Sequence, residues 1–190
     1  MIELKEYETV AQKLNDNFRR ADKIIQEIKV ITNEEPIPAV LQLRYAGTHI
    51  SEWLITGKDS DLQAAETHSK RAIFEAARHG ALFCFAEIVD FRKSYGGDIL
   101  PNIITDYSVK MQFAEKARKE TIIDGNEEER VDACMNSFYK LKDILEEFIA
   151  CQPDLNAVRS RNLQNLYWQI LAASLSVAGV ILAAMAIIHS

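Results

Sequence analysis

The last part of the chain most constrains what the protein can fold into, because it is a long stretch without charge. From Ile170 to Ile188 there are 19 consecutive residues, and none is more polar than Ser174 and Ser176. A helix of this length spans about 28 Å at about 1.5 Å per residue, close to the roughly 30 Å hydrocarbon core of a bilayer. Core helices of globular proteins rarely stay apolar around their whole circumference for so long. The stretch therefore predicts a transmembrane helix.

The residues that flank this stretch predict its orientation. Tyr167 and Trp168 precede it, at the depth where aromatic side chains gather at a membrane interface. Arg159 and Arg161 lie upstream, and no Lys or Arg follows. By the positive-inside tendency, we expect a single-pass protein with its N-terminal part in the cytoplasm.

The rest of the chain has helical periodicity throughout. Apolar residues recur at intervals of three and four, and no segment alternates with period two. We expect an all-α fold with about five helices before the last one, divided into a helical domain over 1–154 and a juxtamembrane and transmembrane helix over 155–190. The expected helices cover about 3–31, 38–56, 61–93 and 104–123, with a fifth that opens at Glu127.

Composition excludes several classes of function. The net charge of −6 disfavours wrapping of nucleic acid by bulk electrostatics, so we expect no DNA partner. The three cysteines have no metal spacing and predict reduced thiols. No phosphate-binding glycine loop or nucleophile elbow is present, and we expect neither a cofactor nor a bound metal.

The last helix carries a stripe of amide and small residues. In lipid, helices associate through close packing and interhelical hydrogen bonds, which small and weakly polar residues favour. The stripe predicts either a self-association seam or the lining of a pore made by a ring of helices, and the sequence does not separate the two. Its members are spaced alternately by three and four: Asn162, Asn165, Gln169, Ala172, Ser176, Gly179, Ala183 and Ala186.

Two other places concentrate titratable side chains. Arg44 and His49 have the RxxxxH spacing, suited to a phosphate-stabilising guanidinium and an acid/base imidazole, but one helix places them roughly 140° apart. The alternative is that His49 packs between its helical neighbours. A second set lies on one face of the third helix and predicts a polar network in the bundle or between subunits. The alternatives are a metal site and an ordinary ion pair between Arg71 and Glu75. The members of this set are His68, Arg71, Glu75 and His79.

These features resemble a known family. The Arg44–His49 motif is that of HEPN domains, α-helical bundles that often act as metal-independent ribonucleases, and the stretch AETHSKRAIFEAARHGAL (residues 65–82) is similar to helices of such bundles. With one membrane span, the chain resembles the small membrane-associated accessory proteins of type VI-B CRISPR systems. The resemblance implies a HEPN-like bundle that oligomerises as a pore in the bacterial inner membrane and acts in antiviral defence beside an RNA-guided RNase.

Three hypotheses follow from the sequence. The first is a homo-oligomeric pore in a lipid bilayer that permeabilises or depolarises the inner membrane. The second is a membrane-tethered HEPN-type ribonuclease that uses Arg44 and His49. The third is a tail-anchored adaptor without activity of its own, which docks a partner through the apolar seam of the first helix between residues 4 and 28.

Overall fold

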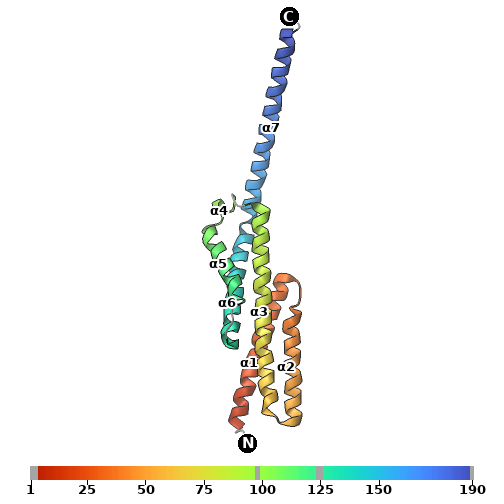
Figure 1. Ribbon diagram of the computed structural model, residues 1–190, viewed down its shortest axis with the longest axis vertical. Coiled ribbons are helices and arrows are strands. Elements are labelled where there is room, and N and C mark those ends of the chain that lie inside the picture. Colours follow the sequence, from red (N-terminus) through yellow and green to blue (C-terminus); the bar gives the residue numbers. More distant parts are fainter. Residues whose placement is uncertain (1–3, 97–98, 123–125, 189–190) are drawn as a thin grey trace.

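The computed structural model describes the backbone of residues 4–96, 99–122 and 126–188 and the side chains of 8–96, 99–122 and 126–176. In these residues every regular element is a helix, which confirms the all-α prediction (Figure 1). The seven described helices are α1 (Leu4–Thr32), α2 (Ile37–Thr56), α3 (Asp59–Tyr95), α4 (Leu100–Ile103), α5 (Tyr107–Glu120), α6 (Glu127–Ala150) and α7 (Gln152–Ile188).

Local signals account for several of the helix ends. Asn33 follows α1 with φ 56°, and Gly57 follows α2 with φ 66°. Both adopt the left-handed conformation that commonly ends a helix. At the start of α6, the Asn126 side chain accepts a hydrogen bond from the Glu129 backbone N–H, which satisfies one of the unpaired donors of the first turn.

The region after α3 differs from the prediction. The single helix expected over 104–123 is wrong in its first part, because the structure has a short α4 (Leu100–Ile103) and a separate α5 that begins at Tyr107. Pro101 fits the first turn of α4, where its missing N–H has no intrahelical partner. Asp106 then takes φ 55°, which a continuous helix does not allow.

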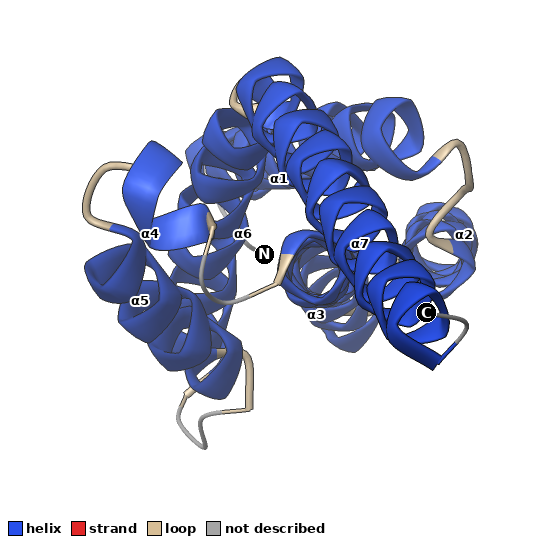
Figure 2. Cartoon of the chain, turned by 90° about the horizontal axis from the view of Figure 1, so that it is seen from above, coloured by secondary structure: helices blue, strands red, loops and turns tan. Residues whose placement is uncertain are grey.

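α3 is the central helix of the bundle. It packs against α1, α2 and α6, and Figure 2 shows it between α2 on one side and α5 on the other. Small residues on α3 permit these close approaches. A Cβ at Gly80 would lie 2.6 Å from Phe138 Cε2 and 2.9 Å from Ile28 Cγ1, so glycine is required where α1, α3 and α6 meet. The buried alanines of this helix are Ala65, Ala72, Ala76, Ala77 and Ala81.

The apolar seam of α1 is used inside the chain. Ala21, Ile25 and Ile28 are buried in the main core, and Leu14 is buried in a smaller cluster with Leu62. The seam therefore holds α1 on α3 between residues 14 and 28, while Ala11 and Phe18 line an open apolar pocket.

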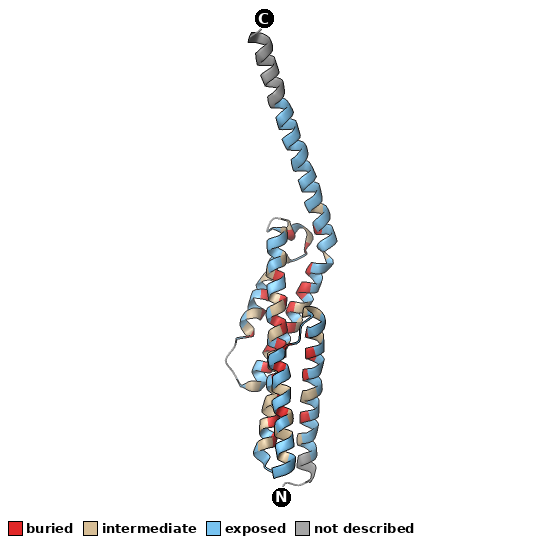
Figure 3. Cartoon of the chain, turned by 90° about the vertical axis from the view of Figure 1, so that its right-hand side faces the viewer, coloured by how far each residue is buried: buried red, intermediate tan, exposed pale blue. Residues whose placement is uncertain are grey.

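α7 leaves the bundle after its first turns. Leu155 is fully buried, and Tyr95 Oη donates to Asn156 Oδ1 at 2.9 Å. Beyond residue 158 every described side chain of α7 is exposed, and the helix extends alone past the bundle (Figures 1 and 3). The start of α7 at Gln152 lies close to the predicted division at 154.

Among the described side chains, which end at residue 176, no helix is long and apolar enough to cross a membrane. Most of the predicted span, from residue 177 onward, lies outside these side chains.

Candidate functional site between α2 and α3

The α2–α3 hairpin brings together side chains that are far apart in sequence. Gly57 and Lys58 connect the two helices, which run back antiparallel to each other. The turn therefore places the second half of α2 beside the first half of α3. His49 and His68, from the two sequence motifs, meet here.

The imidazoles of His49 and His68 stack. Their ring centroids are 5.2 Å apart and their planes differ by 13°. His68 Nδ1 donates to Gln42 Oε1 at 2.7 Å, which fixes the orientation of its ring, and Tyr45 packs against it with centroids 5.6 Å apart. Burial lowers the pKa of His68 below its usual value, with smaller contributions from His49 and Arg71 that Glu127 opposes. The lowered pKa favours the neutral form of the His68 imidazole.

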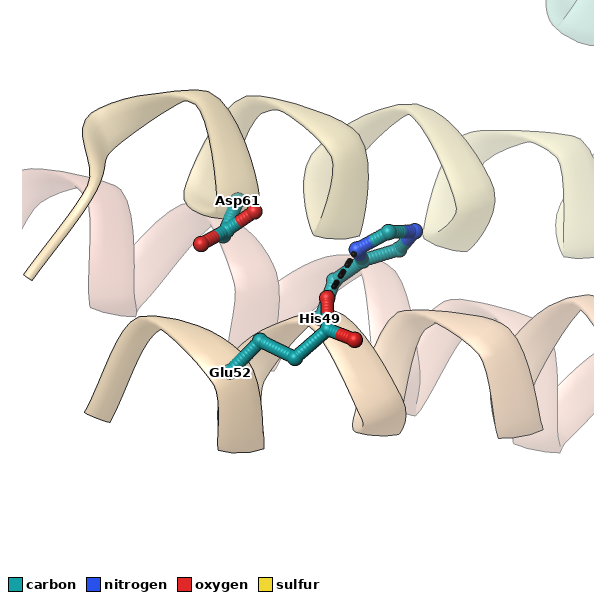
Figure 4. A group of neighbouring side chains, drawn as sticks. All are labelled: His49, Glu52 and Asp61. Carbon is teal, nitrogen blue, oxygen red and sulfur yellow. Dashed lines mark hydrogen bonds and ion pairs between the residues drawn. The ribbon is translucent and has the colours of Figure 1, made fainter. Parts of the chain in front are cut away.

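Two carboxylates, those of Glu52 and Asp61, lie near the His49 ring that stacks on His68. His49 Nδ1 lies 3.1 Å from Glu52 Oε2, one helical turn along α2. Asp61, in the first turn of α3, projects toward the same point, as Figure 4 shows. One ligand-type atom from each of His49, Glu52 and Asp61 lies within 4.8 Å of the other two. Asp61 Oδ2 also accepts a hydrogen bond from Thr56 Oγ1 at 3.0 Å.

Arg44 does not join this cluster. Arg44 is exposed, whereas His49 is half-buried against α3. No hydrogen bond or ion pair joins the two side chains in the described part of the chain. This agrees with the wide angle that their five-residue spacing gives within one helix.

The titratable residues of the third helix do not form one network: His68 stacks on His49, whereas Arg71 and Glu75 face α6. The expected ion pair between Arg71 and Glu75 is wrong, because Arg71 Nε instead lies 3.6 Å from Glu127 Oε1 at the start of α6. Glu75 is half-buried in an open polar cavity of about 500 Å³ between α2, α3 and α6. There the Arg130 guanidinium lies 4.6 Å from the centroid of the Phe74 ring. His79 is half-buried two turns beyond Arg71.

The stripe on α7 falls partly within the described side chains. Asn162, Asn165, Gln169, Ala172 and Ser176 are all exposed. Gly179, Ala183 and Ala186 lie outside the described side chains.

Sequence reasoning missed Gln42, Glu52 and Asp61. Glu52 is three positions after His49 and belongs to the same face of α2, so its proximity was available from helical spacing. Gln42 and Asp61 come near the histidines only through the pairing of α2 with α3, which no local pattern encodes.

No family model matches the chain, and no curated protein or solved structure matches it either.

Proposed function

We propose that this protein is a membrane-anchored homo-oligomer in which α7 inserts into the inner membrane and forms a pore that permeabilises or depolarises it. The observation that carries the proposal is the exposure of α7 beyond the bundle. Leu163, Ile170 and Leu175 have exposed fractions of 59%, 61% and 66%. Each such side chain left in water forgoes about 1.5–3 kcal/mol of burial free energy. Insertion into a bilayer, beside copies of the same helix, would remove these side chains from water.

The described half of α7 has two different faces. At about 100° per residue, the stripe residues from Asn162 to Ser176 occupy an arc of about 80°. The opposite arc carries the large apolar side chains, which suits it to lipid, while the narrow stripe suits contact between helices or water in a pore. The large side chains are Leu163, Leu166, Tyr167, Trp168, Ile170, Leu171 and Leu175.

The hydroxyl groups of Ser174 and Ser176 are satisfied within the helix. Ser174 Oγ donates to the carbonyls of Ile170 and Leu171 at 3.0 and 2.8 Å, and Ser176 Oγ donates to that of Ala172 at 2.9 Å. In hydrocarbon an unpaired hydroxyl costs free energy, so these bonds allow both serines to enter a bilayer.

The biological setting of the proposal rests on the sequence resemblance. The HEPN-like character of the bundle and a role in antiviral defence, downstream of an RNA-guided RNase, belong to the family that the chain resembles. The bundle then acts as the cytoplasmic frame that gathers copies of α7.

The two serines give a matched pair of variants for testing the pore. They are two positions apart, about 200° around the helix, so Ser176→Leu alters the stripe whereas Ser174→Leu alters the opposite face. With the full chain reconstituted in liposomes, we expect ion flux for the wild type. Ser176→Leu is expected to lower the flux at least about tenfold by blocking close helix approach, and Ser174→Leu to retain it. Equal flux from both variants, or none from the wild type, contradicts the pore.

The same preparations test the two alternatives. The ribonuclease hypothesis requires metal-independent RNA cleavage that is lost in His49→Ala, with flux unaffected. The adaptor hypothesis requires binding to the membrane without flux or cleavage in any variant. The pore hypothesis requires flux that depends on Ser176, and intact RNA after long incubation with the wild type.

A further inference from the structure

The cluster of His49, Glu52 and Asp61 has the composition of a divalent metal site. It combines one imidazole with two carboxylates, and one potential ligand atom from each lies within 4.8 Å of the others (Figure 4). Imidazole favours Zn²⁺ and related transition metals, and carboxylates accept the same ions at about 2.0–2.2 Å. We propose that these three side chains bind a first-row divalent transition metal such as Zn²⁺.

Neighbouring residues hold two of the three ligands in place. The His49 ring is stacked on His68, which Gln42 fixes through the 2.7 Å hydrogen bond, so His49 Nδ1 is kept facing the carboxylates. The Asp61 carboxylate is oriented by the hydroxyl of Thr56, which donates to it at 3.0 Å. Such contacts set the orientation of ligands around protein-bound metals. The site is thus partly organised before an ion arrives.

The charges around the cluster favour a cation. Glu52 and Asp61 lie close to each other, and among the described residues neither forms an ion pair with a Lys or Arg. Elsewhere in the described part of the chain, several carboxylates pair with basic side chains, as in Lys29–Glu35 and Lys70–Glu66. A divalent ion neutralises the two carboxylates together. An ion bound through His49 Nδ1 requires the neutral tautomer of the ring that carries its one proton on Nε2.

The proposed ion joins the C-terminal half of α2 to the first turn of α3. It lies near the end of the bundle opposite α7 (Figure 1), so its occupancy is separate from membrane insertion. Three protein ligands leave at least one coordination position for water, the arrangement of an open rather than a closed zinc site.

Metal binding to the full chain in detergent tests this proposal. After treatment with a chelator, titration with ZnCl₂ followed by calorimetry is expected to show one ion per chain and a rise of the thermal unfolding midpoint. His49→Ala and Asp61→Asn are expected to weaken Zn²⁺ binding at least about tenfold and to abolish the rise of the midpoint. His79→Ala, which removes another half-buried histidine of the same hairpin, is expected to bind Zn²⁺ as the wild type does.

Two measurements distinguish binding at this site from binding elsewhere on the protein. The Co²⁺-loaded wild type is expected to show visible absorption bands of a protein-bound ion that are lost in Asp61→Asn, a variant that keeps size and helical propensity. If His49→Ala, Asp61→Asn and His79→Ala bind Zn²⁺ alike, the binding is of an adventitious ion only and the proposal fails. Absence of Zn²⁺ binding by the folded wild type also overturns it.

Discussion

At the scale of single residues, burial controls how the cysteines react. Cys84 and Cys134 are buried, and the loss of solvation raises their pKa values to about 12 and about 11. The thiolate is the reactive form, so both are protected at neutral pH. We expect a disulfide reagent at pH 8 to modify only Cys151, which is partly exposed, and to modify all three cysteines in denaturant. Rapid modification of all three in the native protein would contradict the packing of α3 on α6.

His68 links the folded state to pH. Its pKa is lowered in the folded protein, chiefly by burial, from the ordinary value of 6.5. The unfolded chain therefore binds more protons as the pH falls below about 7, and stability declines until His68 is protonated in both states. We expect the urea midpoint to fall between pH 7.5 and pH 5, and His68→Gln to reduce this dependence. An unchanged dependence in the variant would remove His68 as its source.

At the scale of helices, two glycines in similar secondary structure have opposite roles. A Cβ at Gly80 meets the buried ring of Phe138, whereas a Cβ at Gly47 meets nothing within 4 Å. We expect Gly80→Ala to lower the free energy of unfolding by about 1–3 kcal/mol, because a packed core tolerates added volume poorly. Gly47→Ala is expected to raise it by about 0.5–1 kcal/mol through better helix propensity. Chemical denaturation of both variants checks the contrast, and stabilisation by both would contradict the crossing at Gly80.

At the scale of the whole molecule, the sequence predicts helices better than contacts. Helical periodicity locates most elements, since this signal acts within a few residues. The break at Asp106 was missed because a left-handed aspartate has no distinctive pattern. The role of Gly80 was also missed, because the need for glycine comes from Phe138, 58 positions later in the chain.

The sequence identifies some residues of the candidate site but not how they are arranged in space. His49 and His68 were singled out separately as titratable residues on two helices. Their stacking, and the approach of Asp61, depend on how α2 pairs with α3 across Gly57. The partner of Arg71 was likewise wrong, because Glu127 reaches it only through the packing of α6. These contacts depend on how distant helices pack together, which the local spacing of residues does not encode.

The division between bundle and projecting helix leads to a prediction for truncated chains. Contacts of α7 with the bundle are concentrated near its start, at the buried Leu155 and at the hydrogen bond between Tyr95 and Asn156. A chain that ends after Arg161 keeps both. We therefore expect it to fold without detergent and to unfold cooperatively, since the described side chains beyond residue 158 are exposed and add little to the core.

A shorter truncation provides the control. A chain that ends at Ala150 loses Leu155 and the Tyr95–Asn156 hydrogen bond, and we expect it to be less stable than the longer chain by about 2–4 kcal/mol. Urea denaturation followed by circular dichroism measures the difference. If the chain that ends at Arg161 fails to fold while the full chain folds in detergent, the bundle depends on the rest of α7, and the view of α7 as an independent membrane element is wrong. If both truncated chains are equally stable, the first turns of α7 are not part of the core.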